Sequence, residues 1–404
     1  MGLTAAFKDF FQTEKAGAVV LIACTAISLV IANSRLGESY LGFWHGYMGP
    51  LSVEHWVNDG LMAIFFLLIG LELKRELFVG ELSNLKNASL PIIAAVGGVV
   101  VPAGIHLALN AGTPTQPGIG IPMATDIAFA IGVLALVGDR VPASLKVFLV
   151  ALAVMDDLAA IVVIAVFYTS GLSLMYLGLS LGLLAVLGVL NRLRVMTLIP
   201  YLIGGIIVWY LMLKSGVHAT IAGVLLAFTI PFRGETGDDV ESPSGFLEHI
   251  LHKPVAFLIL PIFALANTGI ILDSGWADDI ASANSMGIMI GLILGKPIGI
   301  TVASIIAVAA GISRLPLDLG WRHIFGAGLL GGIGFTMSIF ITNLAFTGST
   351  AMIDASKMAI LIASTVAGVA GYTFLKLLGA PMQDDEDPDT MDYQSDEEGE
   401  PEAE

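Results

Sequence analysis

Long apolar segments alternate with short polar ones along almost the whole chain. About 20 consecutive apolar residues are enough to cross a lipid bilayer as a helix. Twelve segments come near that length: 15–33, 58–80, 89–110, 121–138, 145–168, 173–190, 198–214, 217–231, 250–271, 285–309, 322–345 and 356–378. We therefore predict an all-α polytopic membrane protein with about twelve transmembrane helices, whose surface is in contact with the lipid bilayer.

The composition supports the same class of protein. Hydrophobic residues make up 56% of the 404 residues and charged residues 13%, whereas a soluble domain has about 25% charged residues. The single cysteine, Cys24, excludes an intramolecular disulfide. We find no cleavable signal sequence and expect the first apolar segment to be retained. We predict no nucleic-acid partner.

The formal net charge of −16 comes mostly from the C-terminal end. Residues 384–404 hold 12 of the 34 acidic residues and no lysine or arginine. We predict a transmembrane domain over residues 1–380 and a disordered cytoplasmic tail over residues 381–404, because so polar a segment cannot bury a core. A passive solubilising tail and a regulatory or partner-binding tail both fit this composition.

The distribution of basic residues predicts the orientation. An even number of spans places both termini on one side of the membrane. With cytoplasmic termini, fourteen lysines and arginines face the cytoplasm, and only Arg35, Lys214 and Lys357 face the outside. Cytoplasmic loops carry the excess of basic residues, so we predict cytoplasmic termini.

The segment 43–56, between the first two spans, is too polar to cross the membrane and should lie outside. It contains a Gly49-Pro50 turn signal and flanking aromatic residues. These features permit a small hairpin at the membrane interface. An irregular loop is the alternative.

Two of the twelve segments have sequences that disfavour a continuous helix. The fourth span is entered through Gly118 and Gly120 and then carries Pro122, and the eleventh, 322–345, contains five glycines. Paired interrupted spans in corresponding positions indicate a transporter site. We predict that spans three to five and ten to twelve form inverted-topology repeats, with spans four and eleven interrupted.

Charged residues well inside the spans are few: Asp126, Asp156, Asp157 and Lys296. Charges at this depth are costly and indicate function, and three acids with one base favour a cation. Adjacent residues point about 100° apart on a helix, so one of Asp156 and Asp157 can bind a cation while the other pairs with Lys296. A buried Asp–Lys pair that only fixes packing is the alternative.

Proton exchange follows from the same residues. Burial favours the neutral forms of these groups, so protons can compete with a metal cation. If one monovalent cation displaces two protons, exchange moves net charge and responds to voltage. Asp126, next to Thr125 at the presumed break, can balance a half-helix dipole or bind the cation directly.

A second charged cluster lies at the inner face, where span two ends and span nine begins. Its members are Glu72, Glu76, Glu248, His249 and His252. Histidine titrates near neutral pH, so this cluster fits a pH sensor and cation funnel. Interfacial charges that only set topology fit equally well.

At these residues the chain resembles the NhaA family of bacterial sodium/proton antiporters. The resemblance covers residues 10–380, in order and at similar spacing. The matching strings are Gly70-Leu-Glu72-Leu-Lys-Arg-Glu76-Leu, Pro122-Met-Ala-Thr125-Asp126-Ile-Ala-Phe, Ala153-Val-Met-Asp156-Asp157-Leu, Leu247-Glu248-His249 and Gly295-Lys296-Pro297.

The resemblance implies roles for these residues in a twelve-span protein of the bacterial inner membrane. Asp157 would be the principal Na⁺ or Li⁺ ligand, with Asp156 as its acidic partner and Thr125 as an assisting oxygen. Asp126 and Lys296 would compensate half-helix dipoles, and Lys296 would also pair with Asp156. The remaining implied roles are pH activation by Glu76, Glu248, His249 and His252, and a dimer-forming hairpin at residues 43–56.

Two features depart from the family pattern. Residues 244–246 are Ser-Gly-Phe, where basic residues are common, and the preceding loop is acidic. The long acidic tail is also unusual.

We therefore predict a secondary active transporter, a pH-regulated electrogenic Na⁺(Li⁺)/H⁺ antiporter, rather than an enzyme, with no cofactor. A cation channel is one alternative. An intramembrane aspartyl protease is another, although its Gly-x-Gly-Asp signature is absent.

Overall fold

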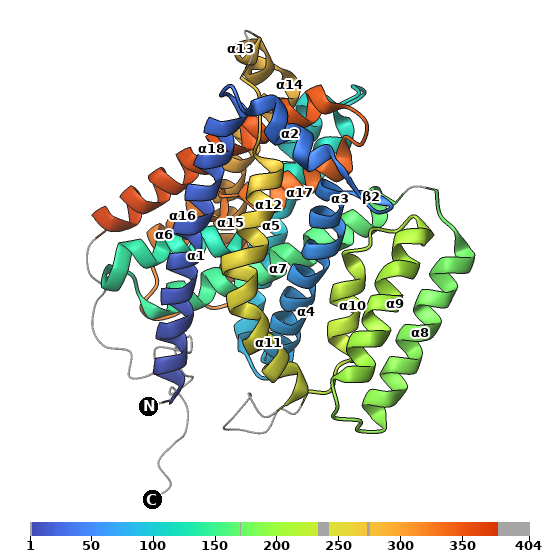
Figure 1. The fold of residues 1–404 in the computed structure, drawn as a ribbon. Coiled ribbons are helices and arrows are strands. Elements are labelled where there is room, and N and C mark those ends of the chain that lie inside the picture. Colours follow the sequence, from blue (N-terminus) through green and yellow to red (C-terminus); the bar gives the residue numbers. More distant parts are fainter. Residues whose placement is uncertain (1, 170, 233–241, 273–274, 379–404) are drawn as a thin grey trace, which may run out of the picture.

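The computed structural model describes residues 2–169, 171–232, 242–272 and 275–378. These residues fold into a bundle of helices, in which α8, α9 and α10 lie side by side at one flank (Figure 1). The elements up to the middle of the chain are α1 (Gly2–Ala32), α2 (Gly37–His45), β1 (Tyr47–Met48), β2 (Leu51–Ser52), α3 (Val53–His55), η1 (Trp56–Leu61), α4 (Met62–Phe78), η2 (Glu81–Ser83), α5 (Leu85–Asn110), η3 (Gln116–Met123), α6 (Ile127–Val137), η4 (Gly138–Arg140), α7 (Ala143–Phe167) and α8 (Leu174–Arg192). The predicted tail, residues 381–404, lies outside the described residues.

The second half of the bundle continues with mostly shorter helices. They are α9 (Ile199–Ser215), α10 (Ile221–Thr229), α11 (Pro243–Pro254), η6 (Val255–Ile259), α12 (Leu260–Asn267), α13 (Trp276–Ala281), α14 (Ala283–Ile290), η7 (Gly291–Gly295), α15 (Lys296–Ala309), α16 (Trp321–Gly331), α17 (Phe335–Ala345) and α18 (Thr350–Leu377). Because η6 and η7 join their neighbours without a break, α11–η6–α12 and α14–η7–α15 are each one long helix.

The all-α membrane class is confirmed, but the count of twelve spans is not. Within the described residues, nine helices are long and apolar enough to cross a bilayer, or ten if α16 and α17 form one bent span. The seventh predicted segment, α9, is shorter, with 17 residues. The eighth, α10, has nine residues, or roughly 14 Å of helix, about half the hydrocarbon thickness.

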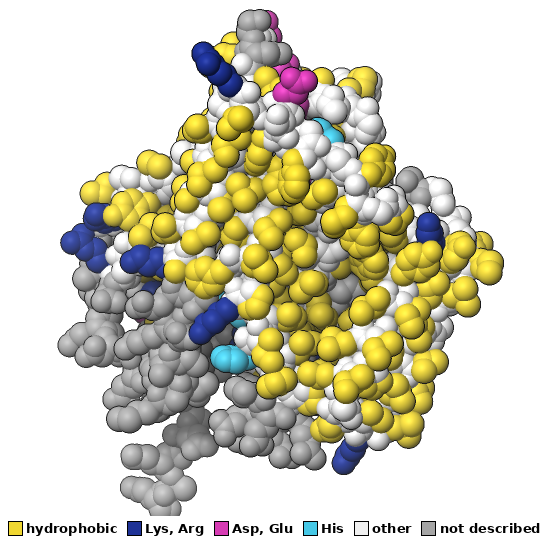
Figure 2. Space-filling model, viewed as in Figure 1, with side chains coloured by type: hydrophobic (Ala, Val, Ile, Leu, Met, Phe, Trp, Pro, Cys, Tyr) yellow, Lys and Arg dark blue, Asp and Glu magenta, His cyan; other side chains and the backbone are white. Residues whose placement is uncertain are grey.

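Exposed apolar side chains cover the helices that lie at the flank. The face seen in Figure 2 is largely hydrophobic, with lysines and arginines near its edges. Large exposed apolar residues recur along α8 and α9, such as Leu174, Val186 and Ile206. Continuous apolar surface on this scale is unusual in soluble proteins, and contact of this surface with lipid stays a prediction.

The helices α5 and α15 cross in close contact because glycine occupies both sides of the crossing. A Cβ atom at Gly97 of α5 would overlap the carbonyl oxygen of Gly299 in α15, and one at Gly299 would overlap the carbonyl of Gly97. Gly287, Gly291 and Gly295 continue this contact toward the start of the long helix. Glycines spaced four residues apart thus let two backbones touch, as they do in other membrane helices.

Two helical segments are broken at the centre of the bundle. The chain is extended at Ala124 between η3 and α6, and α16 and α17 meet at an angle of 48°. The backbone N–H of Asp126 donates to the Ile333 carbonyl at 2.7 Å, so the two breaks lie against each other. This hydrogen bond pairs a backbone N–H of one break with a backbone carbonyl of the other. With a single break, such a group would lack a partner in the hydrocarbon region of a membrane.

The segment between the first two spans forms the predicted hairpin. Tyr47 pairs with Ser52 and Met48 with Leu51 in an antiparallel register. Gly49 closes the turn at φ +72°, a conformation that glycine adopts without steric cost. Both residues of β1 are exposed, Tyr47 to 82%, whereas Leu51 and Ser52 of β2 are half-buried, so β1 is the exposed strand of the hairpin.

The α5–α15 crossing gives a prediction about stability. Gly97→Ala should lower the free energy of unfolding by about 1–3 kcal/mol, the usual cost of overpacking, seen as a lower melting temperature in detergent. Gly104→Ala is the matched control on the same helix, because a Cβ there meets nothing within 4 Å. Equal melting temperatures for the two variants would contradict the close contact.

Candidate functional site

A buried ion pair joins α7 to α15. The Lys296 Nζ lies 2.5 Å from Asp156 Oδ2, and both side chains are 0% exposed. The Thr125 hydroxyl lies 2.6 Å from the same oxygen and 2.8 Å from the Gly331 carbonyl oxygen. With one hydrogen it donates to only one of them at a time. The predicted pairing of Lys296 with an adjacent aspartate is therefore present, and the aspartate is Asp156.

Asp157 has a different environment from its neighbour. It is 1% exposed, and neither carboxylate oxygen has a hydrogen-bond partner among the described residues. A buried carboxylate that is neither paired nor hydrogen-bonded is strongly disfavoured. Such a group needs either a proton or a bound cation.

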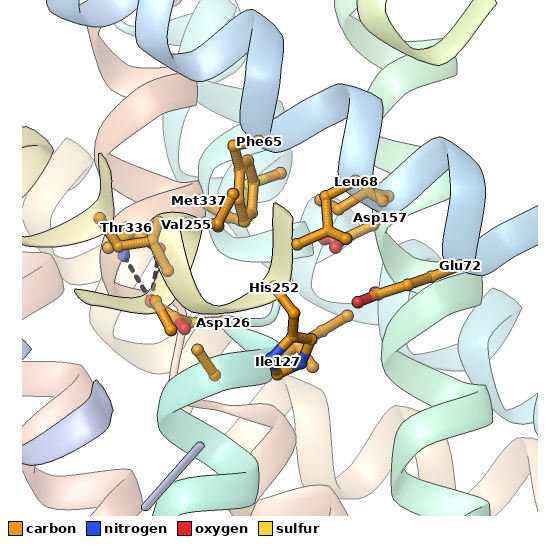
Figure 3. A pocket seen from close by; sticks show the side chains of 14 residues that line it. Phe65, Leu68, Glu72, Asp126, Ile127, Asp157, His252, Val255, Thr336 and Met337 are labelled. Atoms are coloured by element: carbon orange, nitrogen blue, oxygen red, sulfur yellow. Dashed lines mark hydrogen bonds between the residues drawn. The ribbon is translucent and has the colours of Figure 1, made fainter. Parts of the chain in front are cut away.

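Asp157 lines a small cavity that also receives two other acidic side chains. The cavity has a volume of about 40 Å³, which accommodates a small ion or a few water molecules. Its lining residues are Phe65, Leu68, Ile69, Glu72, Asp126, Ile127, Ala128, Asp157, His252, Val255, Ala256, Leu260, Thr336 and Met337. In Figure 3, Asp157, Glu72, His252 and Asp126 surround one space, although they come from different helices. Three carboxyl groups within apolar walls favour a cation over an anion.

Asp126 stabilises the N-termini of two helices at the break. Its Oδ1 accepts from the Phe129 backbone N–H at 3.0 Å, at the start of α6. Its Oδ2 accepts from the Thr336 N–H at 3.0 Å and the Thr336 hydroxyl at 2.5 Å, at the start of α17. A carboxylate in this position offsets the positive ends of both helix dipoles. Since Asp126 also lines the cavity, direct cation binding is compatible with the same geometry.

The inner-face cluster divides into two parts in the structure. Arg75 binds Glu76 at 3.1 Å and Glu248 at 2.9 Å, whereas Glu72 and His252 line the cavity. The fifth predicted member, His249, is exposed. The cluster therefore lies next to the cavity, and Glu72, which lines the cavity and interacts electrostatically with Arg75, links its two parts.

Two basic residues beside the inner-face cluster, Lys74 and Arg75, were not among the site residues predicted from the sequence. Arg75 is the centre of the ion pairs, and its position between Glu72 and Glu76 could have indicated this. Lys74 is buried and donates to the carbonyl oxygens of Ala227 and Ile230 at the end of α10. Its partners are about 150 residues away in the sequence, so no local pattern identifies them.

The aspartate pair does not have the arrangement of a protease. Aspartic proteases use two carboxyl groups that share a proton. Here Asp156 Oδ2 is held by Lys296, and Asp157 points to a different environment. This geometry counts against the protease alternative.

Comparison with known proteins places this chain among transporters. The family model Na⁺/H⁺ antiporter 1 matches residues 8–375. The Na⁺/H⁺ antiporter NhaA of Dechloromonas aromatica is 64% identical over 374 residues, which are 92% of this chain and 96% of that protein. The NhaA of Cytophaga hutchinsonii is 59% identical over 93% of this chain and 96% of that protein. NhaA 1 of Flavobacterium johnsoniae is 58% identical over 94% and 98%.

The Lys296–Asp156 pair gives a prediction that a double-mutant cycle can test. Lys296→Met should destabilise the protein by roughly 3–5 kcal/mol, because it leaves a buried carboxylate without its cation. Adding Asp156→Asn should recover much of that loss. The measurement is thermal unfolding in detergent, with the exposed Lys376→Met as a control. A double variant no more stable than Lys296→Met would contradict a direct charge pairing.

Proposed function

The chain belongs to the Na⁺/H⁺ antiporter 1 family, and on that premise we propose that it exports Na⁺ or Li⁺ in exchange for protons. The observation that carries this proposal is Asp157, a buried carboxylate without a hydrogen-bond partner in an acidic cavity. Either a proton or a metal cation neutralises it, and binding of one excludes the other. This competition is the basis of exchange.

The neighbouring residues complete the proposed site. Asp157 is the principal ligand, with Asp156 and the Thr125 oxygen joining it when Lys296 releases Asp156. Asp156 Oδ1 is already without a hydrogen-bond partner among the described residues, so it adds a further acceptor. Since Na⁺ and Li⁺ are small cations without directional bonding, carboxylate and hydroxyl oxygens suit them.

Alternating access follows from the cost of a buried charge. A site with a bound cation or with protons is neutralised and can be exposed to either side of the membrane in turn. An empty ionised site is expected to resist the conformational change because its charge stays unpaired. Each conformational change therefore carries either a cation out of the cell or protons into it.

Electrogenic exchange requires a second proton for each cation. We propose that Lys296 carries it: cation binding separates Lys296 from Asp156, and the freed ammonium loses its proton. Together with the proton from Asp157, two protons then move for each Na⁺. Such exchange responds to the membrane potential.

Regulation by pH is proposed for the cluster around Arg75. Glu76 and Glu248 are bound to Arg75, and Glu72 and His252 line the cavity within the same end of the bundle. Protonation of a histidine here changes the charge at the cavity. The cluster can thus link cytoplasmic pH to the access of the cation to the cavity. This proposal places the protein in the bacterial inner membrane, with both termini in the cytoplasm.

A homodimer through residues 43–56 is also proposed. The two-stranded hairpin leaves strand edges unpaired within the described chain, and Tyr47 and Met48 are exposed. A second copy can extend such an edge by strand pairing.

The first test concerns Asp157. Asp157→Asn keeps the shape of the side chain but not its charge, and should abolish exchange. The measurement is the Na⁺- or Li⁺-driven release of a ΔpH dye's quenching in everted membrane vesicles. Asp278→Asn, on the exposed helix α13, is the control for a carboxylate outside the cavity. Normal exchange by Asp157→Asn would refute the assignment of the site.

The second test concerns Lys296. Lys296→Ala should make exchange independent of voltage, because one transported proton is lost. Purified protein in liposomes, with the potential set by a K⁺ gradient and valinomycin, provides the measurement. If the variant exchanges and its rate still follows the imposed potential, Lys296 does not carry a transported proton.

A further inference from the structure

Three asparagine side chains meet at the end of the bundle that carries the hairpin. They are Asn58 in η1, Asn267 at the end of α12 and Asn343 in α17. Asn267 is central: its amide N–H groups donate to Asn58 Oδ1 at 2.8 Å and to the Phe263 carbonyl at 3.0 Å. Its Oδ1 accepts from Asn343 at 2.6 Å and from Asn58 at 3.3 Å. We call these three residues the amide cluster.

The amide cluster lies on the same helices that line the cation cavity. Seven residues separate Asn58 from Phe65, Asn267 from Leu260, and Asn343 from Thr336, and each of these partners lines the cavity. Seven helical residues correspond to roughly 10 Å. The amide cluster is therefore about two helical turns from the cavity, on the side away from Arg75.

Aromatic rings pack together beside the cavity. Phe66, Phe263 and Phe340 come from the same three helical segments and are at most 1% exposed. The ring centroids of Phe66 and Phe340 are 5.4 Å apart, and those of Phe263 and Phe340 are 6.5 Å apart. Along their helices, Phe263 and Phe340 lie between the cavity-lining residues and the asparagines, whereas Phe66 directly follows a residue that lines the cavity.

The amide cluster also lies at the boundary between the predicted repeats and the rest of the bundle. Asn343 is on α17, within the second predicted repeat, whereas Asn58 and Asn267 are on spans outside both repeats. The cavity lies at the same boundary, since Asp157 and Thr336 come from the repeats and Leu68 and Leu260 do not. In transporters built from repeats, one unit moves against the other around the site.

We propose that the amide cluster is the gate on the hairpin side of the cation path, an assignment that rests on the proposed antiport. The gate is closed when the cavity serves the Arg75 side, and its hydrogen bonds break when the cavity serves the hairpin side. Amides suit this role because they are neutral and do not retain a passing cation. Their oxygen atoms also replace water around Na⁺ when the gate parts.

One amide oxygen of the cluster has room for a further contact. Asn343 Oδ1 is buried without a hydrogen-bond partner among the described residues. In the proposed gate this oxygen is available to a cation or to water when the hydrogen bonds between the asparagines break.

Reversible cross-linking across the boundary tests the gate. Asn267→Cys/Asn343→Cys is made in a Cys24→Ser chain and joined by oxidation or by a short bis-methanethiosulfonate. Na⁺-driven exchange in everted vesicles should be lost after cross-linking and restored by a reductant. The matched control is Asn284→Cys/Ser356→Cys, whose parent side chains are also hydrogen-bonded, at 2.7 Å, but lie within one predicted repeat. Its cross-link should leave exchange unchanged.

The outcomes separate the gate from the antiport itself. Exchange that persists in a verified Asn267–Asn343 cross-link overturns the gate and leaves the antiport intact. Equal loss in the control pair overturns the gate as well. Absence of exchange in the parent Cys24→Ser chain, with protein present in the membrane, overturns the proposed function and the gate with it.

A second measurement does not depend on a cross-link. Asn343→Leu removes the amide, and Phe340→Cys, one turn deeper, reports access from outside intact cells to a membrane-impermeant maleimide. The leucine variant should label about fivefold faster, the effect of losing roughly one hydrogen bond. Asn284→Leu is the control and should not change the rate. Unchanged labelling in Asn343→Leu would overturn the gate.

Discussion

A carboxylate buried inside a membrane-spanning bundle must be matched by positive charge, and three of them lie close together here. Asp126 is matched by the N-termini of α6 and α17, and Asp156 is matched by Lys296. Asp157 has no such match in the described chain. The three acids therefore differ in how completely the protein itself neutralises them. Only Asp157 requires a proton or a bound cation, either of which can dissociate. The proposed exchange depends on this difference.

The irregular backbone at the centre of the bundle makes this arrangement possible. A continuous helix through residues 121–138 would place Asp126 on a side wall, with its backbone already bonded. The break turns Asp126 into a cap and brings its N–H to Ile333. The same break presents the Thr125 hydroxyl to Asp156. Proline and glycine in these segments are thus needed for chemistry, since they free the backbone from regular pairing.

The sequence predicted the features that depend on composition and local pattern. Apolar length identified most of the membrane helices, and the isolated charges predicted a pair between Lys296 and one of two adjacent aspartates, of which the family resemblance indicated Asp156. The Gly49-Pro50 turn favoured the hairpin without excluding an irregular loop. The sequence did not predict that α10 would be only nine residues long. The division of the inner cluster around Arg75 and the meeting of Asn58, Asn267 and Asn343 were also missed. These depend on which helices become neighbours, and a periodic pattern gives the buried face of a helix but not its partner.

The glycine contact between α5 and α15 has a consequence for how the molecule can move. The helix α5 belongs to the first predicted repeat and α15 to the second, and their backbones touch at Gly97 and Gly299. Close-packed interiors transmit displacement rather than absorb it. A displacement of α5 is therefore passed directly to α15, and with it to the backbone of Lys296. Because α5 also packs against α7, the backbones that carry Lys296 and Asp156 rest on the same helix, and we expect the pair to separate on cation binding by side-chain movement alone.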